Sequence, residues 1–143
     1  MLTSQYCYFA LKSITVTADD VAEWLGMRPD EIMVMGSKDP ERNVPPVHAW
    51  KIVCRSAEDV DQQIEHIVGR LAPVREGLVA LVAESDVSPV MQVVRYFNDD
   101  DVQARHDHDR QPSLGWNVSL EVLDFLTSTR TVLDVDEYDL SGA

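Results

Sequence analysis

The fold can first be read from two adjoining segments: Leu114-Gly-Trp-Asn-Val-Ser-Leu-Glu-Val-Leu-Asp-Phe-Leu126 and Val132-Leu-Asp-Val-Asp-Glu-Tyr138. They predict a strand, a helix and a strand, joined by short connections. Ser119 stands where a helix N-cap is expected, and Glu121 places a negative charge in the first turn, where the helix dipole favours it.

The closing segment alternates apolar and acidic residues. Leu133 and Val135 would face one side of a strand, and Asp134 and Asp136 would face the other. This alternation indicates a half-buried strand with an acidic, exposed face. We expect these carboxylates to lie on the solvent-exposed face of the strand, because nothing around them in the sequence indicates a catalytic cleft.

The order of a strand, a hydroxyl-bearing cap and a helix occurs twice more. Thr17 begins a predicted helix over 18–26, and Ser56 begins one over 57–71. The second helix has a regular apolar stripe that includes Ile64. Further strands are predicted over residues 6–14, 31–35, 48–54, 78–83 and 90–97.

The element order through residue 84 is therefore β-α-β-β-α-β, which is the ferredoxin-like order. The remainder adds strand, strand, helix and strand. We expect a single α+β domain over residues 1–143, with a mainly antiparallel sheet and helices packed on it. The alternative is two smaller α/β sheets packed together, since the strand, cap and helix order recurs.

The charge of the chain limits its partners. The formal net charge is −13, from 25 acidic and 12 basic residues. This excess disfavours nucleic-acid binding and favours solubility or attraction to a basic partner. No apolar run approaches the ~20 residues of a membrane span, and the N-terminal sequence does not resemble a secretory signal.

The two cysteines, Cys7 and Cys54, lie in apolar strand patterns. They indicate reduced core residues of a cytoplasmic protein. The alternative is a cysteine nucleophile with His48 as its base, but no basic cluster or helix N-terminus is near to lower a thiol pKa. Because phosphate-binding glycine loops, nucleophile elbows and Cys-x-x-Cys are absent, no catalytic residue and no cofactor is predicted.

Several segments together form a familiar pattern: Thr-Ala-Asp-Asp-Val-Ala-Glu-Trp-Leu-Gly-Met-Arg-Pro-Asp at 17–30, Gly36, His-Ala-Trp-Lys-Ile at 48–52, Arg-Leu-Ala-Pro at 70–73 and Val-Ser-Leu-Glu-Val-Leu at 118–123. With these segments the chain resembles the bacterial domain-of-unknown-function family DUF4279. The resemblance implies a small intracellular α+β domain and transfers no catalytic residue. The loop over 98–113 is longer and more charged than the resemblance leads us to expect.

One segment combines metal-ligand residue types. His106 and His108 flank an aspartate, and an extended segment would place both imidazoles on one face. This permits weak surface chelation, but a lasting site needs ligands fixed by a second layer of contacts. A solvated acidic loop without a bound metal is therefore the expectation.

The leading functional hypothesis is a non-enzymatic module that binds a basic protein, for example a toxin-neutralising immunity protein. Its predicted binding residues are the acids of the last loop and last strand: Asp99, Asp100, Asp101, Asp107, Asp109, Asp134 and Asp136, with Glu137 beside them. The alternative is a small-molecule or weakly catalytic pocket formed by His48, Trp50, Lys38 and Arg42. Trp24, Trp50 and Trp116 could line such a pocket, although core positions are expected for them.

Overall fold

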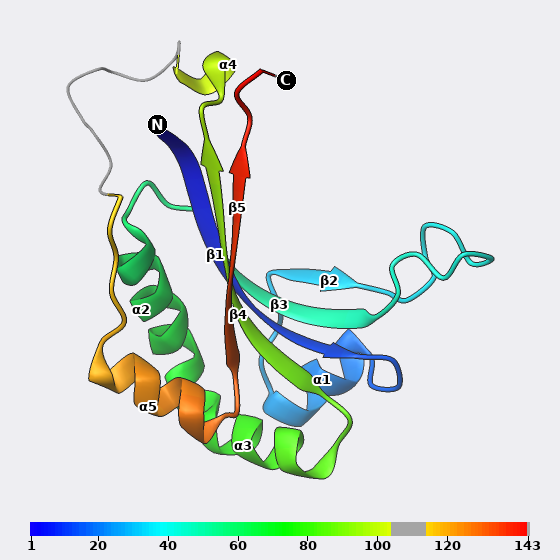
Figure 1. The fold of residues 1–143 in the computed structure, drawn as a ribbon. Coiled ribbons are helices and arrows are strands. Elements are labelled where there is room, and N and C mark those ends of the chain that lie inside the picture. Colours follow the sequence, from blue (N-terminus) through cyan, green and yellow to red (C-terminus); the bar gives the residue numbers. More distant parts are fainter. Residues whose placement is uncertain (104–113, 143) are drawn as a thin grey trace.

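The computed structural model describes residues 1–103 and 114–142 as one five-stranded sheet with helices (Figure 1). The strand order is β2-β3-β1-β4-β5. The strands are β1 (Leu2–Ser13), β2 (Glu31–Met33), β3 (His48–Cys54), β4 (Ser88–Phe97) and β5 (Val132–Asp139). The helices are α1 (Ala18–Leu25), α2 (Val60–Leu71), α3 (Arg75–Glu84), α4 (Asp100–Gln103) and α5 (Leu120–Ser128).

The sheet is mainly antiparallel, as predicted. The long strand β1 lies at its centre and pairs antiparallel with both β3 and β4, and β2 pairs antiparallel with β3. Only β5 differs, because it runs parallel to β4. The α+β class is therefore confirmed, and a single sheet replaces the alternative of two smaller ones.

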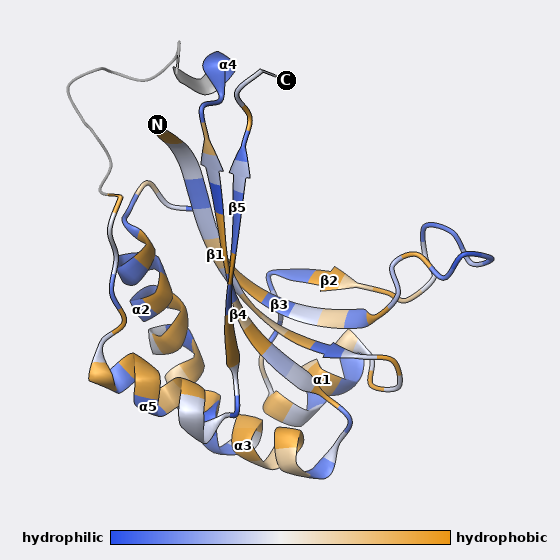
Figure 2. Ribbon diagram, in the orientation of Figure 1, coloured by the Kyte–Doolittle hydropathy of each residue, from blue (hydrophilic) through white to orange (hydrophobic). Residues whose placement is uncertain are grey.

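The core lies between one face of this sheet and α1, α2, α3 and α5 (Figure 1). Alternate residues of β1, such as Phe9, are fully buried there beside Ile52 of β3 and Met91 of β4. The predicted stripe of α2 supplies Ile64, which is also fully buried. Figure 2 shows hydrophobic and hydrophilic residues alternating around α2, as expected for a helix with one buried side.

Two of the three predicted helix caps are confirmed. The Thr17 hydroxyl accepts the N–H of Asp20 in a capping box, and the Ser119 hydroxyl accepts the N–H of Val122. The prediction for Ser56 is wrong, because α2 begins four residues later with Asp59 as its N-cap.

The fully buried side chain of Gln63 explains this shift. Its amide nitrogen donates to the carbonyl of Ser56 at 2.9 Å and to that of Glu58 at 3.1 Å. These two hydrogen bonds fold the segment before α2 back onto the helix. Ser56 therefore belongs to that turn and not to the helix start.

The predicted strand over 78–83 is also wrong, because these residues lie in α3. A short continuous apolar run cannot distinguish a strand from a buried helix, and here Leu78 and Leu81 are buried at helical spacing while Val79 is exposed. Pro73 lies in a 3-10 turn that leads from α2 into α3. Proline is tolerated in such a first turn. The ferredoxin-like order is consequently not confirmed.

The strand predicted over 114–118 is absent, since this segment has no regular secondary structure. Its backbone is instead held by a side chain: the guanidinium of Arg95 donates to the carbonyl of Leu114 at 2.9 Å. Arg95 is nearly buried and also reaches Gln5 and Glu137. A single arginine therefore connects β1, β5 and the segment before α5.

Trp24 does not lie on the buried stripe of α1, because 47% of its surface is exposed. Its indole N–H donates to the carbonyl of Gly77 on α3 at 3.0 Å. The two helices approach closely here, since a Cβ at Gly77 would lie 3.2 Å from Leu25. Trp24 therefore bridges α1 and α3 at the surface.

Candidate functional site

Within residues 1–103 and 114–142, no helix lies on the second face of the sheet, and we call it the helix-free face. Because side chains alternate along a strand, the residues between the core positions of β1 and β4 point to this side. All four tyrosines of the chain lie there. They are Tyr6 and Tyr8 on β1, Tyr96 on β4 and Tyr138 on β5.

The tyrosine rings form two stacked pairs. The ring centroids of Tyr6 and Tyr8 are 6.2 Å apart with an angle of 24° between the planes. Those of Tyr96 and Tyr138, which are opposite each other in the register of β4 and β5, are 5.4 Å apart at 22°. Offset stacking of this kind contributes about 0.5–1.5 kcal/mol for each pair. The rings therefore form an ordered aromatic surface.

Basic side chains lie on the β3 side of the tyrosines. The ammonium of Lys51 is 4.5 Å from the centre of the Tyr8 ring, and the guanidinium of Arg55 is 4.3 Å from that of Tyr6. Arg55 also forms a 3.1 Å ion pair with Glu31 of β2. These cation–π contacts hold the tyrosines against the strand surface.

Acidic side chains lie on the opposite, β5 side. In the register of the sheet, Asp134 is opposite Gln92 and Asp136 is opposite Val94. Gln92 and Val94 are in turn opposite Tyr8 and Tyr6. The helix-free face thus changes from basic at β3, through aromatic at β1 and β4, to acidic at β5.

The middle of this face is buried, although no helix of the described residues covers it. Ala10 is fully buried, Gln92 is 4% exposed and Val94 is 5% exposed. Long neighbouring side chains therefore lie flat over the strands. The same burial raises the pKa of Tyr8 and lowers the pKa of Lys51, because it disfavours the charged form of each group.

A second group of acids lies where β4 and β5 end together, since these strands are parallel and Phe97 is opposite Asp139. Asp99, Asp100 and Asp101 follow one residue after the end of β4. Asn98 donates to the carboxylate of Asp139 at 2.9 Å. This bond and that from Ser141 lower the pKa of Asp139 to about 2, so the group is ionised. Asp107 and Asp109 lie outside the described residues.

The predicted acidic residues that the structure describes lie on β5 and in the segment after β4. We call this set the β5 acidic surface: Asp99, Asp100, Asp101, Asp134 and Asp136. Glu137 points to the other side of β5, where its carboxylate lies 3.5 Å from Arg95.

The residues of the alternative pocket are distributed differently. Trp50 is fully buried among core residues, where its indole N–H donates to the carbonyl of Met27 at 3.2 Å. His48 accepts the backbone N–H of Met35 at its Nδ1 atom. Lys38 and Arg42 are exposed on the loop after β2, which projects away from the sheet (Figure 1). A pocket at these residues stays a prediction.

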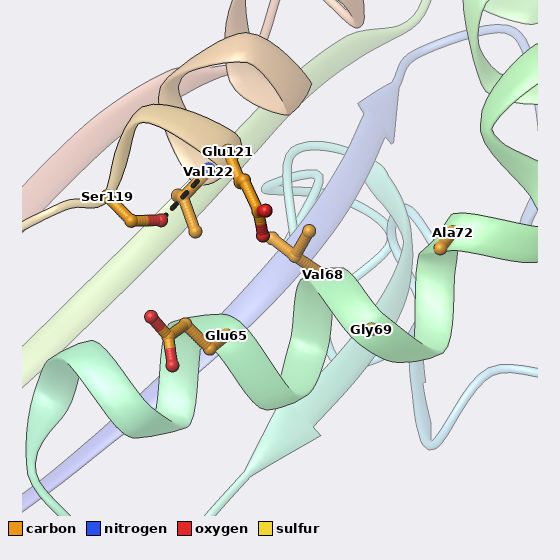
Figure 3. Close-up of a pocket in the computed structure, with 7 residues that line it drawn as sticks. All are labelled: Glu65, Val68, Gly69, Ala72, Ser119, Glu121 and Val122. Atoms are coloured by element: carbon orange, nitrogen blue, oxygen red, sulfur yellow. Dashed lines mark hydrogen bonds between the residues drawn. The ribbon is translucent and has the colours of Figure 1, made fainter.

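A groove between α2 and the start of α5 encloses about 360 Å³ (Figure 3). Its walls carry Glu65 and Glu121, which come from different helices, and Val68 and Val122 form part of its floor. The Ser119 hydroxyl at its rim is already used as the cap of α5. The groove therefore offers two carboxylates and an apolar base.

The thiols of Cys7 and Cys54 are free and directly opposite each other on β1 and β3. Both are buried, and burial raises the pKa of Cys7 to about 12. A thiol with so high a pKa is a poor nucleophile at neutral pH. These residues are therefore core residues, as predicted.

Within residues 1–103 and 114–142, no group of three or more His, Cys, Asp or Glu side chains is placed to hold a metal ion. His106 and His108, the candidate chelating residues, lie outside this part of the chain. No described helix is long and apolar enough to cross a membrane.

Residues 3–140 match the model of a family described as a domain of unknown function, DUF4279. The chain belongs to the DUF4279 family. The match covers almost the full chain, from the beginning of β1 to the end of β5. No curated protein and no solved structure matched.

The tyrosine surface of this DUF4279 domain is the feature that the sequence interpretation missed. The run Tyr6-Cys7-Tyr8-Phe9 contains a signal for it, because two tyrosines alternate with two core residues. The other two could not be placed with them, since Tyr96 depends on the antiparallel pairing of β4 with β1 and Tyr138 on the parallel pairing of β5 with β4.

Proposed function

We propose that this DUF4279 domain is a non-enzymatic module that binds a basic protein partner. The observation that carries the proposal is the β5 acidic surface, which gathers carboxylates from β5 and from the residues after β4. Asp134 and Asp136 are exposed, so a partner can reach them without any rearrangement of the fold.

The charge of the surface would act mainly on the encounter. Complementary charge accelerates association, and the acceleration decreases as salt screens it. A net charge of −13 extends this attraction over the whole chain, while the local carboxylates orient the partner.

The tyrosines beside these acids would supply contact area. Tyr138 is 47% exposed and stacks on Tyr96, so its ring is already ordered before a partner arrives. Tyrosine is enriched in protein interfaces because it offers a large, rigid surface at a low entropic cost. In this proposal the carboxylates orient the partner, and the tyrosine rings form the contact surface.

The direction in which carboxyl pKa values are shifted also favours a binding role over acid–base catalysis. The pKa values of Asp20, Asp30 and Asp139 are lowered by hydrogen bonds, which stabilise the ionised form. A carboxyl group that acts as a general acid near neutral pH needs a raised pKa instead.

An immunity protein that neutralises a basic toxin is a concrete version of this proposal. It would act in the cytoplasm, and the two free thiols accord with a reducing compartment. Nucleic acid is an unsuitable partner for the same surface, because phosphates would be repelled.

The test begins with the protein that co-purifies from the native host. Its association rate is measured by stopped flow over a series of salt concentrations, with wild type and with Asp99, Asp100 and Asp101 changed to Asn. We expect slower association at low salt and a weaker salt dependence in the variant, with an unchanged melting temperature.

A matched variant separates local charge from total charge. Glu23→Gln, Glu84→Gln and Asp86→Asn remove the same formal charge from exposed positions on α1, at the end of α3 and in the turn after it. This control should slow association less. The wild type and the variant with Asp99, Asp100 and Asp101 changed to Asn could instead bind the partner equally fast at low salt. That result would show that those charges only keep the protein soluble.

A further inference from the structure

The two edges of the sheet are built differently. β2 has three residues, whereas β5 has eight, which is longer than the usual five or six. Natural edge strands are commonly shortened, bulged, or protected by proline or charged side chains to prevent pairing with other chains. β5 contains no proline, and its register with β4 runs without a shift from Val132 to Asp139. Its charged residues are all acidic, so they disfavour pairing with an acidic strand and favour pairing with a basic one.

The outer side of β5 is accessible in the described part of the chain. β4 is its only neighbour in the sheet there, and every residue of β5 except the half-buried Leu133 is exposed. A strand that pairs on one side turns half of its backbone N–H and C=O groups to the other side. β5 therefore presents a long, regular edge that can accept another strand.

We infer that β5 accepts an extended segment of the basic partner as a sixth strand of the sheet. The segment has lysine or arginine at alternate positions and apolar residues between them. This inference rests on the proposed function and specifies how the partner is recognised.

The alternation of acidic and apolar side chains along β5 determines which side chains the partner segment needs at alternate positions. Asp134 and Asp136 lie on the helix-free side, while Leu133 and Val135 lie on the opposite side. An added strand about 4.8 Å away would place its side chains on the same two sides in turn. Its cations would contact the aspartates, and its apolar residues would cover Val135, which is 37% exposed.

Charge complementarity selects this occupant over a second copy of the chain. Pairing β5 with β5 of another copy would bring the aspartates of the two strands onto one small surface. Like charges on neighbouring strands are destabilising, whereas opposite charges contribute favourably. The exposed ring of Tyr138 adds a site where a cation can stack.

The probe is a soluble nine-residue peptide of alternating lysine and valine, compared with the same peptide carrying glutamate in place of lysine. Binding to the full chain is followed by backbone amide NMR at low salt. We expect the lysine peptide to shift the amide signals of β5 and slow their hydrogen exchange. The glutamate peptide should leave them unchanged.

Backbone methylation tests the mode of binding. An added strand turns only alternate N–H groups towards β5, so two lysine peptides are compared, one N-methylated at every valine and one at every lysine. We expect one of them to lose binding and the other to retain it. Equal binding of both, with charge selectivity kept, would overturn strand addition and leave the proposed function standing.

Charge variants complete the experiment. Asp134→Asn with Asp136→Asn should weaken binding of the lysine peptide about fivefold, as expected for two exposed ion pairs. Asp19→Asn with Glu23→Gln, on α1, is the matched control and should change it much less. Changing Asp134 and Asp136 to lysine should transfer the preference to the glutamate peptide.

Two further outcomes would contradict the inference. If the wild type binds the lysine and glutamate peptides equally, both strand addition to a basic segment and the proposed function fail. If the wild type sediments as a dimer and β5 amides are protected without any peptide, the occupant of the edge is a second copy, and the inference fails alone.

Discussion

The two faces of the sheet use the same strands for different purposes. On the helix-covered face, Phe9, Trp50 and Ile52 are fully buried. On the helix-free face, the residues between them are Tyr8 and Lys51, which are only half-buried and carry polar groups at their tips. A period of two along β1 and β3 thus separates residues that stabilise the fold from residues that are available for recognition.

The difference lies in what covers each face. Four helices exclude water from the first face, so its side chains can be purely apolar. The second face excludes water only through its own side chains, and these must therefore be long and polar at the end, such as tyrosine and lysine. Substitutions should accordingly change stability on the first face and binding on the second.

The largest expected effect is on the covered face. Ile64→Ala should lower the free energy of unfolding by about 2–5 kcal/mol, because it leaves a cavity at a fully buried position of α2. Denaturant unfolding followed by circular dichroism measures this change.

A valine on the uncovered side supplies the control. Val132 on β5 is 63% exposed, and Val132→Ala should change the free energy of unfolding by less than about 0.5 kcal/mol. Similar losses for the two variants would mean that the two faces contribute equally to the free energy of unfolding.

The covered face was largely predictable from the sequence. The stripe of α2 and the caps at Thr17 and Ser119 depend on residues close in the chain, so local patterns reveal them. The error at 78–83 arose because a continuous run of apolar residues carries no period, so it does not distinguish a strand from the helix α3.

The helix-free face was predictable only in part. The alternation of acids in β5 was visible in the sequence, and so was the exposure of Asp134. The meeting of β5 with β4 depends on a parallel pairing across more than thirty residues, which no local pattern specifies. The stacking of Tyr96 on Tyr138 and the position of the β5 acidic surface follow from this pairing, so local sequence patterns do not reveal them.

A smaller effect is expected at the β2 end of the sheet, where the two faces meet. The carboxylate of Asp30 accepts two hydrogen bonds from Arg70 of α2, at 2.5 and 2.9 Å, and one from the backbone N–H of Val53, at 2.8 Å. Asp30→Ala should lower the free energy of unfolding at neutral pH by about 1 kcal/mol, since the ion pair is partly exposed to solvent.

The contribution of Asp30 should depend on pH. Hydrogen bonds from Arg70 lower its pKa in the folded state, so its contribution is present above the unfolded pKa of about 4. The contribution is lost as the pH falls through the folded pKa. The difference in unfolding free energy between wild type and Asp30→Ala should therefore shrink below about pH 4. A constant difference across this range would show that Asp30 acts through packing and not through its charge.

The smallest expected effect connects the tyrosines to the acids of β5. Burial is the main cause that raises the pKa of Tyr8, and the ring of Tyr6 and the carboxylates of Asp136 and Asp134 raise it further. Changing both aspartates to Asn should therefore lower the pKa of Tyr8 while leaving it above its ordinary value. Titration of the tyrosine ring signals by NMR, with Tyr8→Phe for assignment, measures the change.

This titration tests whether the tyrosines and the β5 carboxylates of the helix-free face interact as one continuous surface. The pair Asp19→Asn and Glu23→Gln removes the same charge from α1 and should leave Tyr8 unchanged. Because the folded pKa of Tyr8 is raised, its contribution to stability is present below the unfolded pKa of about 10 and is lost as the pH rises through the folded pKa. If the β5 and α1 variants shift Tyr8 equally, the effect is one of net charge. The carboxylates of β5 would then have no specific electrostatic interaction with Tyr8. A partner would contact the acids and the tyrosines as two separate surfaces.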